Sequence, residues 1–157
     1  MADRQARKNA FLYCKFRDEQ FASYDAYVKR HGLLMNTLLT VNALYYAKDG
    51  LTQREICRRT LLSKQTVNLI IKHLLAEESA TADSNEADHR SQIIRMTDQG
   101  RARYGEAVRH ITRSEDDAMA TLTPQEQQTL VELSRKFTNK LIELINADME
   151  EQDHGIL

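Results

Sequence analysis

One short segment of the chain gathers six polar side chains that could form hydrogen bonds to another molecule: Ser63, Lys64, Gln65, Thr66, Asn68 and Lys72. Gln and Asn amides can each bond adenine twice, Lys can donate to guanine or to phosphate, and a Thr methyl group can contact thymine. A helix here would turn its apolar residues, such as Val67 and Ile71, to the opposite face. The segment therefore has the composition of a face that reads nucleic-acid bases, although an ordinary solvated helix face has the same kind of composition.

The same part of the chain is locally basic. The whole protein has a formal net charge of −1. Between residues 54 and 74, however, the only anion, Glu55, is outnumbered by the cations Arg54, Arg58, Arg59, Lys64 and Lys72. A basic segment in a neutral protein favours an anionic partner such as nucleic acid.

A second candidate contact is Arg90, which follows Asp88 and His89 in a polar stretch. An Arg on a hairpin suits insertion into a narrow, electronegative minor groove. We expect Asp88 to orient it through an ion pair. An Arg in a polar loop can also simply be solvated.

Local signals predict the elements that must position these residues. Thr52 and Glu55 form a capping box that opens a short helix ending near Arg59, and Ser63 can cap a helix from Lys64 to about Ala76. Two short helices joined by a tight turn are typical of a helix-turn-helix. Weak strand residues at 79–82 and a β-branched run at 92–96, separated by polar turn residues, then predict a two-stranded hairpin, or wing.

Long helices are expected at both ends of the chain. Apolar residues recur at helical spacing from Gln5 to Arg30 and again over 33–45; a further helix follows Gly100 to about Thr121, and Thr123-Pro124 opens the last one. The last helix carries an apolar stripe from Leu130 to Ile145. Together with three aromatic residues at 11, 16 and 21, this stripe is either core or a dimer interface.

Composition narrows the class of protein. A chain of 157 residues with five Gly and one Pro fits one mainly α domain. Cys14 and Cys57 form no disulfide framework, and no secretory leader or 20-residue apolar span is present, so we expect a cytoplasmic protein without membrane contact. No phosphate loop, nucleophile motif or metal-binding motif is found, so we expect neither an enzyme nor a cofactor. The nearest approach to metal-ligand spacing is Glu106 with His110.

Four segments in order resemble the MarR family of winged helix-turn-helix transcriptional regulators: Leu51-Thr52-Gln53-Arg54-Glu55-Ile56, Ser63-Lys64-Gln65-Thr66-Val67-Asn68, Asp88-His89-Arg90 and Met96-Thr97-Asp98-Gln99-Gly100. The last two match the family's wing signature, D-x-R, five residues, then L-T-x-x-G, with Met96 in place of Leu. The resemblance spans about Leu33 to Leu144.

The resemblance implies a single domain over 1–157, with a winged-helix lobe at about 33–98 and a helical dimerisation base at about 5–32 and 99–150. It implies a homodimer that binds palindromic double-stranded DNA, probing the major groove with Lys64, Gln65, Thr66, Asn68 and Lys72 and the minor groove with Arg90. It also implies a repressor that a small lipophilic or phenolic effector releases from DNA. Tyrosines that could line the effector site, or be ordinary packing residues, are Tyr24, Tyr27, Tyr45, Tyr46 and Tyr104.

Three residues or segments depart from the family pattern. Leu69 stands where the family often has Arg, Ser79 stands where a Gly commonly closes the recognition helix, and strand residues 80–82 have low β propensity. These departures keep open an alternative, a helical protein-interaction module that no longer binds DNA. A second alternative is an oxidation-sensing regulator that uses Cys14, whose thiolate Lys15 and Arg17 could favour, although a structural Cys is the plainer interpretation.

Overall fold

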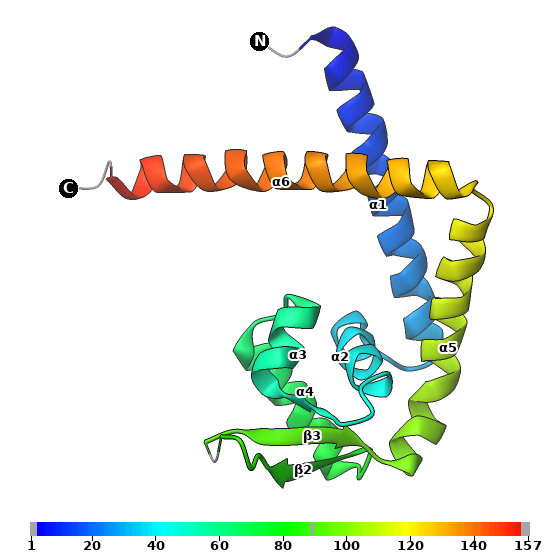
Figure 1. The fold of residues 1–157 in the computed structure, drawn as a ribbon, viewed down its shortest axis with the longest axis vertical. Coiled ribbons are helices and arrows are strands. Elements are labelled where there is room, and N and C mark those ends of the chain that lie inside the picture. Colours follow the sequence, from blue (N-terminus) through cyan, green and yellow to red (C-terminus); the bar gives the residue numbers. More distant parts are fainter. Residues whose placement is uncertain (1–2, 89, 155–157) are drawn as a thin grey trace. The chain divides into compact units, whose positions relative to one another are not determined.

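The computed structural model describes residues 3–88 and 90–154, with side chains as far as residue 147. The described chain contains α1 (Arg4–Arg30), α2 (Met35–Tyr45), β1 (Leu51–Thr52), α3 (Gln53–Thr60), α4 (Lys64–Ala76), β2 (Ala80–Ser84), β3 (Gln92–Met96), α5 (Asp98–Ala120) and α6 (Pro124–His154) (Figure 1). It divides into two compact units, residues 1–112 and 113–157, which are described separately. The expected mainly α winged-helix fold is confirmed.

The helix-turn-helix forms through the predicted caps. The Thr52 hydroxyl accepts a hydrogen bond from the Glu55 amide at 3.2 Å, and the Glu55 carboxylate accepts one from the Thr52 amide at 2.8 Å. Ser63 Oγ accepts from the Thr66 amide at 3.1 Å and so opens α4. Leu61, in the left-handed region with φ of 59°, makes the turn between the two helices.

The end of α4 shows how the chain replaces the expected glycine. The amide of Glu78 donates to the Leu75 carbonyl, and the amide of Ser79 donates to the Leu74 carbonyl. This is the Schellman pattern, and its left-handed residue is Glu78, with φ of 57°. The left-handed residue therefore lies one position before Ser79, and a non-glycine residue in this conformation costs about 1–2 kcal/mol.

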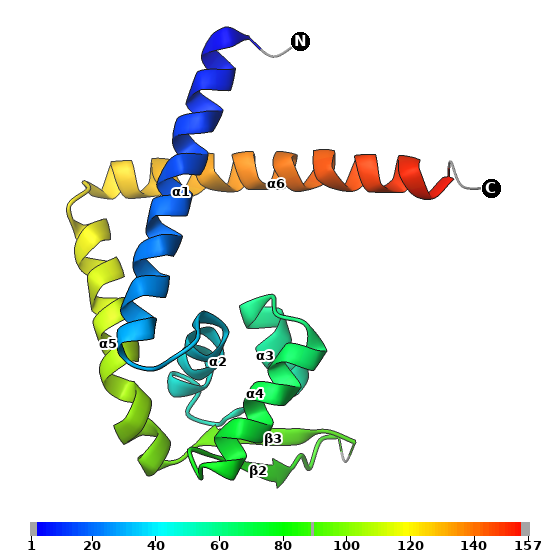
Figure 2. The ribbon, with the colours of Figure 1, turned by 180° about the vertical axis from the view of Figure 1, so that it is seen from behind.

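The sheet has three strands, in the order β1-β3-β2, rather than the two expected. Strands β2 and β3 form the predicted antiparallel wing, with Ala82 opposite Ile94. Residues Leu51 and Thr52 add a short strand, with Leu51 opposite Ile94 on the other edge of β3. The sequence at Thr52 signals a helix cap. Because a cap residue has an extended backbone, Thr52 and Leu51 before it can also pair with β3. Figure 2 shows α3 and α4 on the same side of the wing strands.

The core of the first unit lies between the helix-turn-helix, the sheet and the helices on either side of it. Val41 and Leu44 of α2, Ile56 of α3, and Val67 and Leu74 of α4 are fully buried. Helix α5 contributes Tyr104, Ala107 and Val108 to this core. The polar face of α4 is free for contacts because Val67, Ile71 and Leu74 on its other face are packed here.

The wing signature residues at 96–100 join the end of α4 to the start of α5. Thr97 Oγ1 donates to the Glu78 carbonyl at 2.7 Å and accepts from the Gly100 amide at 3.0 Å. Gly100 packs directly on the backbone of Ser79: a Cβ added there would lie 2.0 Å from the Ser79 carbonyl oxygen. The glycine of the signature is thus required by a close approach between backbones.

The second unit consists of the end of α5, a short turn and α6. The predicted start signal is confirmed. Thr123 and Glu126 exchange hydrogen bonds as a capping box, and Pro124 is the first residue of α6. Apolar residues of α6 are exposed, among them Leu133 at 60% and Leu144 at 57%.

Candidate nucleic-acid interface

Helix α4 presents one polar face to solvent. Gln65, Leu69 and Lys72 are exposed and Asn68 is half-buried. Spacings of three and four residues place these side chains on one face of the helix. Three of the residues expected to contact bases therefore share a surface, and Leu69 lies among them.

Two of the expected contact residues have a local structural task. Besides capping α4 through its backbone contact, Ser63 Oγ lies 2.9 Å from Thr66 Oγ1, within hydrogen-bonding distance. Thr66 is half-buried, whereas Lys64 and Gln65 beside it are exposed. The Thr66 and Ser63 hydroxyls thus stabilise the first turn of α4, which carries the exposed side chains of Lys64 and Gln65.

Gln53 is a residue of this surface that the sequence did not single out. Its Nε2 donates to the Lys64 carbonyl at 3.0 Å, which ties the first turn of α3 to the first turn of α4. Together with Ser63, Lys64, Gln65 and Asn68, Gln53 lines a hollow of about 540 Å³. Gln53 therefore helps to set the angle at which the N-terminus of α4 leaves the turn.

A second hollow, of about 790 Å³, lies between the helix-turn-helix and the wing. Asn68 and Lys72 of α4 line one side, and Asp88 and Arg90 of the wing line another. Arg54, on the first turn of α3, also lines it. Four predicted contact residues thus meet in one concave surface. Sequence reasoning noted Arg54 only as part of the basic segment, which was the signal that could have identified it.

The wing tip is ordered by its own side chains. Asn85 Nδ2 donates to Ser91 Oγ at 2.8 Å, and the Arg90 backbone amide donates to Asp88 Oδ1 at 3.1 Å. The expected ion pair between Asp88 and Arg90 is wrong: among the ion pairs of the described residues none joins them, because the carboxylate is held by the backbone amide of the turn. The Arg90 side chain is exposed, and His89 lies outside the described residues.

Another arginine of the wing, Arg95, is paired with a carboxylate. Arg95 on β3 forms an ion pair with Asp83 on β2 at 2.7 Å, across the two strands. Opposite charges across a strand pair stabilise the pairing. This contact supports strand β2, whose residues have low β propensity.

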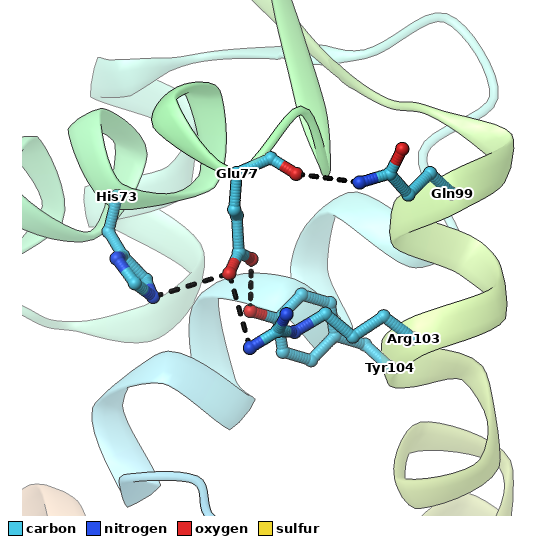
Figure 3. A network of polar contacts seen from close by, with 5 residues as sticks. All are labelled: His73, Glu77, Gln99, Arg103 and Tyr104. Carbon is cyan, nitrogen blue, oxygen red and sulfur yellow. Dashed lines mark hydrogen bonds and ion pairs between the residues drawn. The ribbon is translucent and has the colours of Figure 1, made fainter.

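A polar network fixes the C-terminal end of α4 against α5 (Figure 3). The Glu77 carboxylate accepts a hydrogen bond from the Tyr104 hydroxyl and lies 3.3 Å from the Arg103 guanidinium and 3.4 Å from His73 Nε2. The Glu77 backbone carbonyl accepts from Gln99 Nε2 at 2.8 Å. The recognition helix is therefore anchored at both ends, by Gln53 at one and by Glu77 at the other.

The network shifts the pKa values of Glu77, which is partly buried, and of Tyr104, which is buried. Burial alone would raise the pKa of Glu77, but the Tyr104 hydrogen bond and the Arg103 charge outweigh burial, so that the pKa is lowered. Burial and the Glu77 carboxylate raise the pKa of Tyr104 to about 12. Tyr104 is only 1% exposed, and it acts as an anchor in the core rather than as the lining of an open cleft.

We expect Glu77→Gln to destabilise the fold at pH 7 by about 1–2 kcal/mol, because it weakens a partly buried, charge-assisted contact. The pKa of Glu77 is lower in the folded than in the unfolded chain. Its ionised form therefore contributes stability above the ordinary pKa of 4.5, and this contribution disappears as the pH falls through the lowered value. Urea unfolding at pH 7 and pH 3 should show the difference from the wild type shrinking in acid. Glu78→Gln, an exposed neighbour, is the control, and an equal difference at both pH values would contradict the prediction.

The tyrosines considered for an effector site differ in their surroundings. The Tyr45 hydroxyl accepts from Arg109 at 2.7 Å, and the Arg101 guanidinium carbon lies 5.2 Å from the centre of the Tyr45 ring. Tyr46 is 54% exposed and its hydroxyl donates to Thr112 at 3.1 Å. These contacts join α2 to α5. Tyr24, on α1, is half-buried.

Tyr27 belongs to a separate aromatic cluster. Its ring stacks on His110 at 4.7 Å and lies 4.6 Å from His31. Glu106 and His110, the pair nearest to metal-ligand spacing, are thus beside a packed ring. Within the described residues no group of three or more His, Cys, Asp or Glu side chains could hold a metal ion.

Cys14, the candidate redox residue, is partly exposed on α1. The two cations expected to favour its thiolate each have a carboxylate partner: Lys15 lies 3.5 Å from Glu19, and Arg17 lies 2.8 Å from Asp18. Their positive charge is therefore shared with these carboxylates. In the described part of the chain, no helix is both long and apolar enough to cross a membrane.

Comparisons with known proteins agree with this architecture. Residues 31–91 match the model of the MarR family. An uncharacterized HTH-type transcriptional regulator of Bacillus subtilis, YdgJ, is 22% identical over 110 residues, which make up 70% of this chain and 66%, just under two thirds, of that protein.

Solved structures share the fold at low sequence identity. AbsC, a MarR family transcriptional regulator from Streptomyces coelicolor, has a TM-score of 0.75 at 14% identity, with 91% of this chain and 98% of that chain covered. NMB1585, a MarR family regulator from Neisseria meningitidis, has a TM-score of 0.70 at 18% identity, covering 89% and 97%. MepR of S. aureus in its complex with DNA has a TM-score of 0.67 at 19% identity, covering 85% and 97%. Residues 31–91 thus match the MarR family of transcriptional regulators, and the chain has the winged helix-turn-helix fold of solved members of that family.

Proposed function

We propose that the protein is a sequence-specific DNA-binding repressor that acts in the cytoplasm as a homodimer on a palindromic operator. The observation that carries this proposal is the concave surface between α4 and the wing, lined by Arg54, Lys72 and Arg90 together with the amide side chain of Asn68. Cations attract the phosphate backbone, and amides read base edges. Three elements thus contribute complementary groups to one surface.

Helix α4 would enter the major groove with its N-terminal turn. Lys64 and Gln65 are exposed on that turn, and Asn68 follows one turn later. The groove is about 12 Å wide, which admits a helix. The shared fold supports this placement, since MepR of S. aureus, which has this fold, has been captured in complex with DNA.

The wing would place Arg90 in the adjacent minor groove. We expect Arg90→Ala to weaken binding most on operators with A/T-rich flanks, because the narrow minor groove there has the most negative potential. Fluorescence anisotropy with A/T-flanked and G/C-flanked duplexes measures the effect. Equal loss on both flanks would mean that Arg90 contacts only phosphate. Arg113→Ala is the control, since it removes an exposed arginine of α5 that lies outside the wing.

Dimerisation would cover the apolar residues that the long helices expose. On α1 they include Phe11 at 70% and Phe21 at 59%, and on α6 they include Ile142 at 52%. Exposed apolar surface of this extent is typical of an interface. We propose that residues 1–157 act as one domain, with about 33–98 binding DNA and about 5–32 with 99–150 forming the dimer. Sedimentation equilibrium would show a monomer if this is wrong.

We further propose that a small lipophilic or phenolic effector relieves repression. Support comes from the junction of α2 and α5, where exposed Tyr46 adjoins Tyr45 with ring centres 5.2 Å apart. An aromatic ligand that inserted here would disturb contacts that fix α5 beside the winged lobe. This effector site is tested by measuring whether phenols release bound operator from the wild type and from Tyr46→Ala. Release by peroxide that Cys14→Ser abolishes would instead support oxidation sensing.

The binding surface itself is tested by paired charge variants. Arg54→Ala with Lys72→Ala removes two cations of the concave surface, four in a dimer, and should lower affinity for duplex DNA more than about 100-fold at low salt. Arg30→Ala with Arg113→Ala removes the same charge from exposed helix positions elsewhere and should change affinity less than about twofold. Equal losses in the two double variants would show a general charge effect and contradict the assigned surface.

A further inference from the structure

Leu69 is an apolar side chain in the middle of a polar face. It is 66% exposed, whereas the other large apolar residues of α4 are buried or half-buried, with Val67 and Leu74 at 0% and Ile71 at 6%. Exposure alone means little, because Leu34 at 70% and Leu61 at 89% are exposed elsewhere. The position of Leu69 is what sets it apart.

That position is in line with two residues of the proposed DNA-binding face. Leu69 follows Gln65 by four residues and precedes Lys72 by three, so the three side chains are neighbours along one row of the helix. All three are exposed. A groove that receives Gln65 and Lys72 therefore also covers Leu69.

We infer that Leu69 contacts the 5-methyl group of a thymine in the major groove and makes that base part of the recognised sequence. This inference rests on the proposed DNA-binding function. The thymine methyl is the only methyl group that the four bases present in the major groove. Leu has no hydrogen-bonding group, so opposite any other base edge it would remove water from donors and acceptors without replacing the lost hydrogen bonds.

The contact changes the kind of specificity expected from this helix. An Arg at this position would favour guanine through two hydrogen bonds, whereas Leu selects a methyl group. Gln65 and Asn68 beside it have the amide groups that suit adenine. We therefore expect A·T pairs at the centre of each half-site.

Removing single methyl groups from the DNA tests this contact. Duplexes enriched by the wild type from a random library are resynthesised with each thymine replaced singly by uracil, which removes the methyl and keeps base pairing. One position in each half-site should lose affinity by about three- to fivefold, the value for one buried methyl group. Leu69→Ala should bind the thymine and uracil duplexes equally at that position. Leu34→Ala, which truncates an exposed Leu just before α2, should keep the wild-type difference.

The outcomes distinguish a failure of the role of Leu69 from a failure of the DNA-binding function on which it rests. If the wild type enriches no duplex, both the DNA-binding function and the role of Leu69 are overturned. If it enriches an operator but no uracil substitution matters, or if Leu69→Ala keeps the same methyl dependence, only the role of Leu69 is overturned. Thermal unfolding of Leu69→Ala should match the wild type, since the side chain packs little in the folded chain.

Discussion

Raising the salt concentration from 50 to 200 mM should weaken binding to the operator by about 10⁴-fold. The proposed surface provides four exposed cations in each copy, Arg54, Lys64, Lys72 and Arg90. A dimer would then neutralise about eight phosphates, and each neutralised phosphate adds about −0.9 to the slope of log affinity against log salt. The expected slope is therefore about −7.

The slope distinguishes a DNA-binding protein from a helical interaction module. The double variant Arg54→Ala with Lys72→Ala should bring the slope from about −7 to between −3 and −4, since the dimer loses four contacts. The double variant Arg30→Ala with Arg113→Ala should leave it unchanged. A wild-type slope near zero would mean that DNA is not the partner, and the interaction module would then be the better description.

Gly100→Ala should destabilise the protein by about 3 kcal/mol or more, which is a large part of the stability of an ordinary domain. The added Cβ would lie 2.0 Å from the Ser79 carbonyl oxygen and 2.8 Å from its carbonyl carbon. Both are backbone atoms, and the same carbonyl already accepts the Thr97 amide, so the backbone cannot move without breaking that contact. Thermal unfolding should show a midpoint lower by about 6–12 °C, if the variant folds at all.

Gly105→Ala is the matched control on the same helix. There the added Cβ would meet the far end of the Arg109 side chain at 2.7 Å, which can move aside, and the Tyr45 ring at 3.2 Å. The higher helix propensity of Ala, about 1 kcal/mol, offsets this crowding. We expect a change within about 1 kcal/mol. Similar losses in the two variants would show that helix α5 tolerates no side chain at either position and that the Ser79 contact is not special.

The elements that the sequence predicted well are those defined by local signals. Helix α4 begins after Ser63 and ends at Ala76 as expected, because the cap and the apolar period both lie within the segment itself. The capping boxes at Thr52 and Thr123 are also contacts between residues three apart. Such contacts can be read from residue type and spacing alone.

Features that depend on distant partners escaped prediction. Strand β1 forms because Leu51 pairs with Ile94, 43 residues later, and two residues carry no strand signal of their own. Likewise Gln53 reaches the carbonyl of Lys64, and Tyr104 reaches the carboxylate of Glu77, only after the helices have packed. Sequence spacing does not specify such contacts.

The candidate site shows the same division. Asn68, Lys72, Asp88 and Arg90 line one hollow. These residues could be predicted because the recognition helix and the wing that hold them both have local sequence signals. The ion pair expected between Asp88 and Arg90 is wrong, and in the turn the Asp88 carboxylate accepts a hydrogen bond from the Arg90 backbone amide instead. Residue types could indicate the chemistry of the wing tip, but its hydrogen-bonding partners depend on the backbone conformation.

Selection from a random duplex library at about 100–150 mM salt is the most direct test of the central claim. A dimeric reader with one recognition helix in each half should enrich a pseudo-palindrome whose half-sites are about one helical turn apart. Arg54→Ala with Lys72→Ala should fail to enrich it under the same conditions. A folded wild-type dimer that enriches no sequence would contradict the proposal that this surface reads DNA.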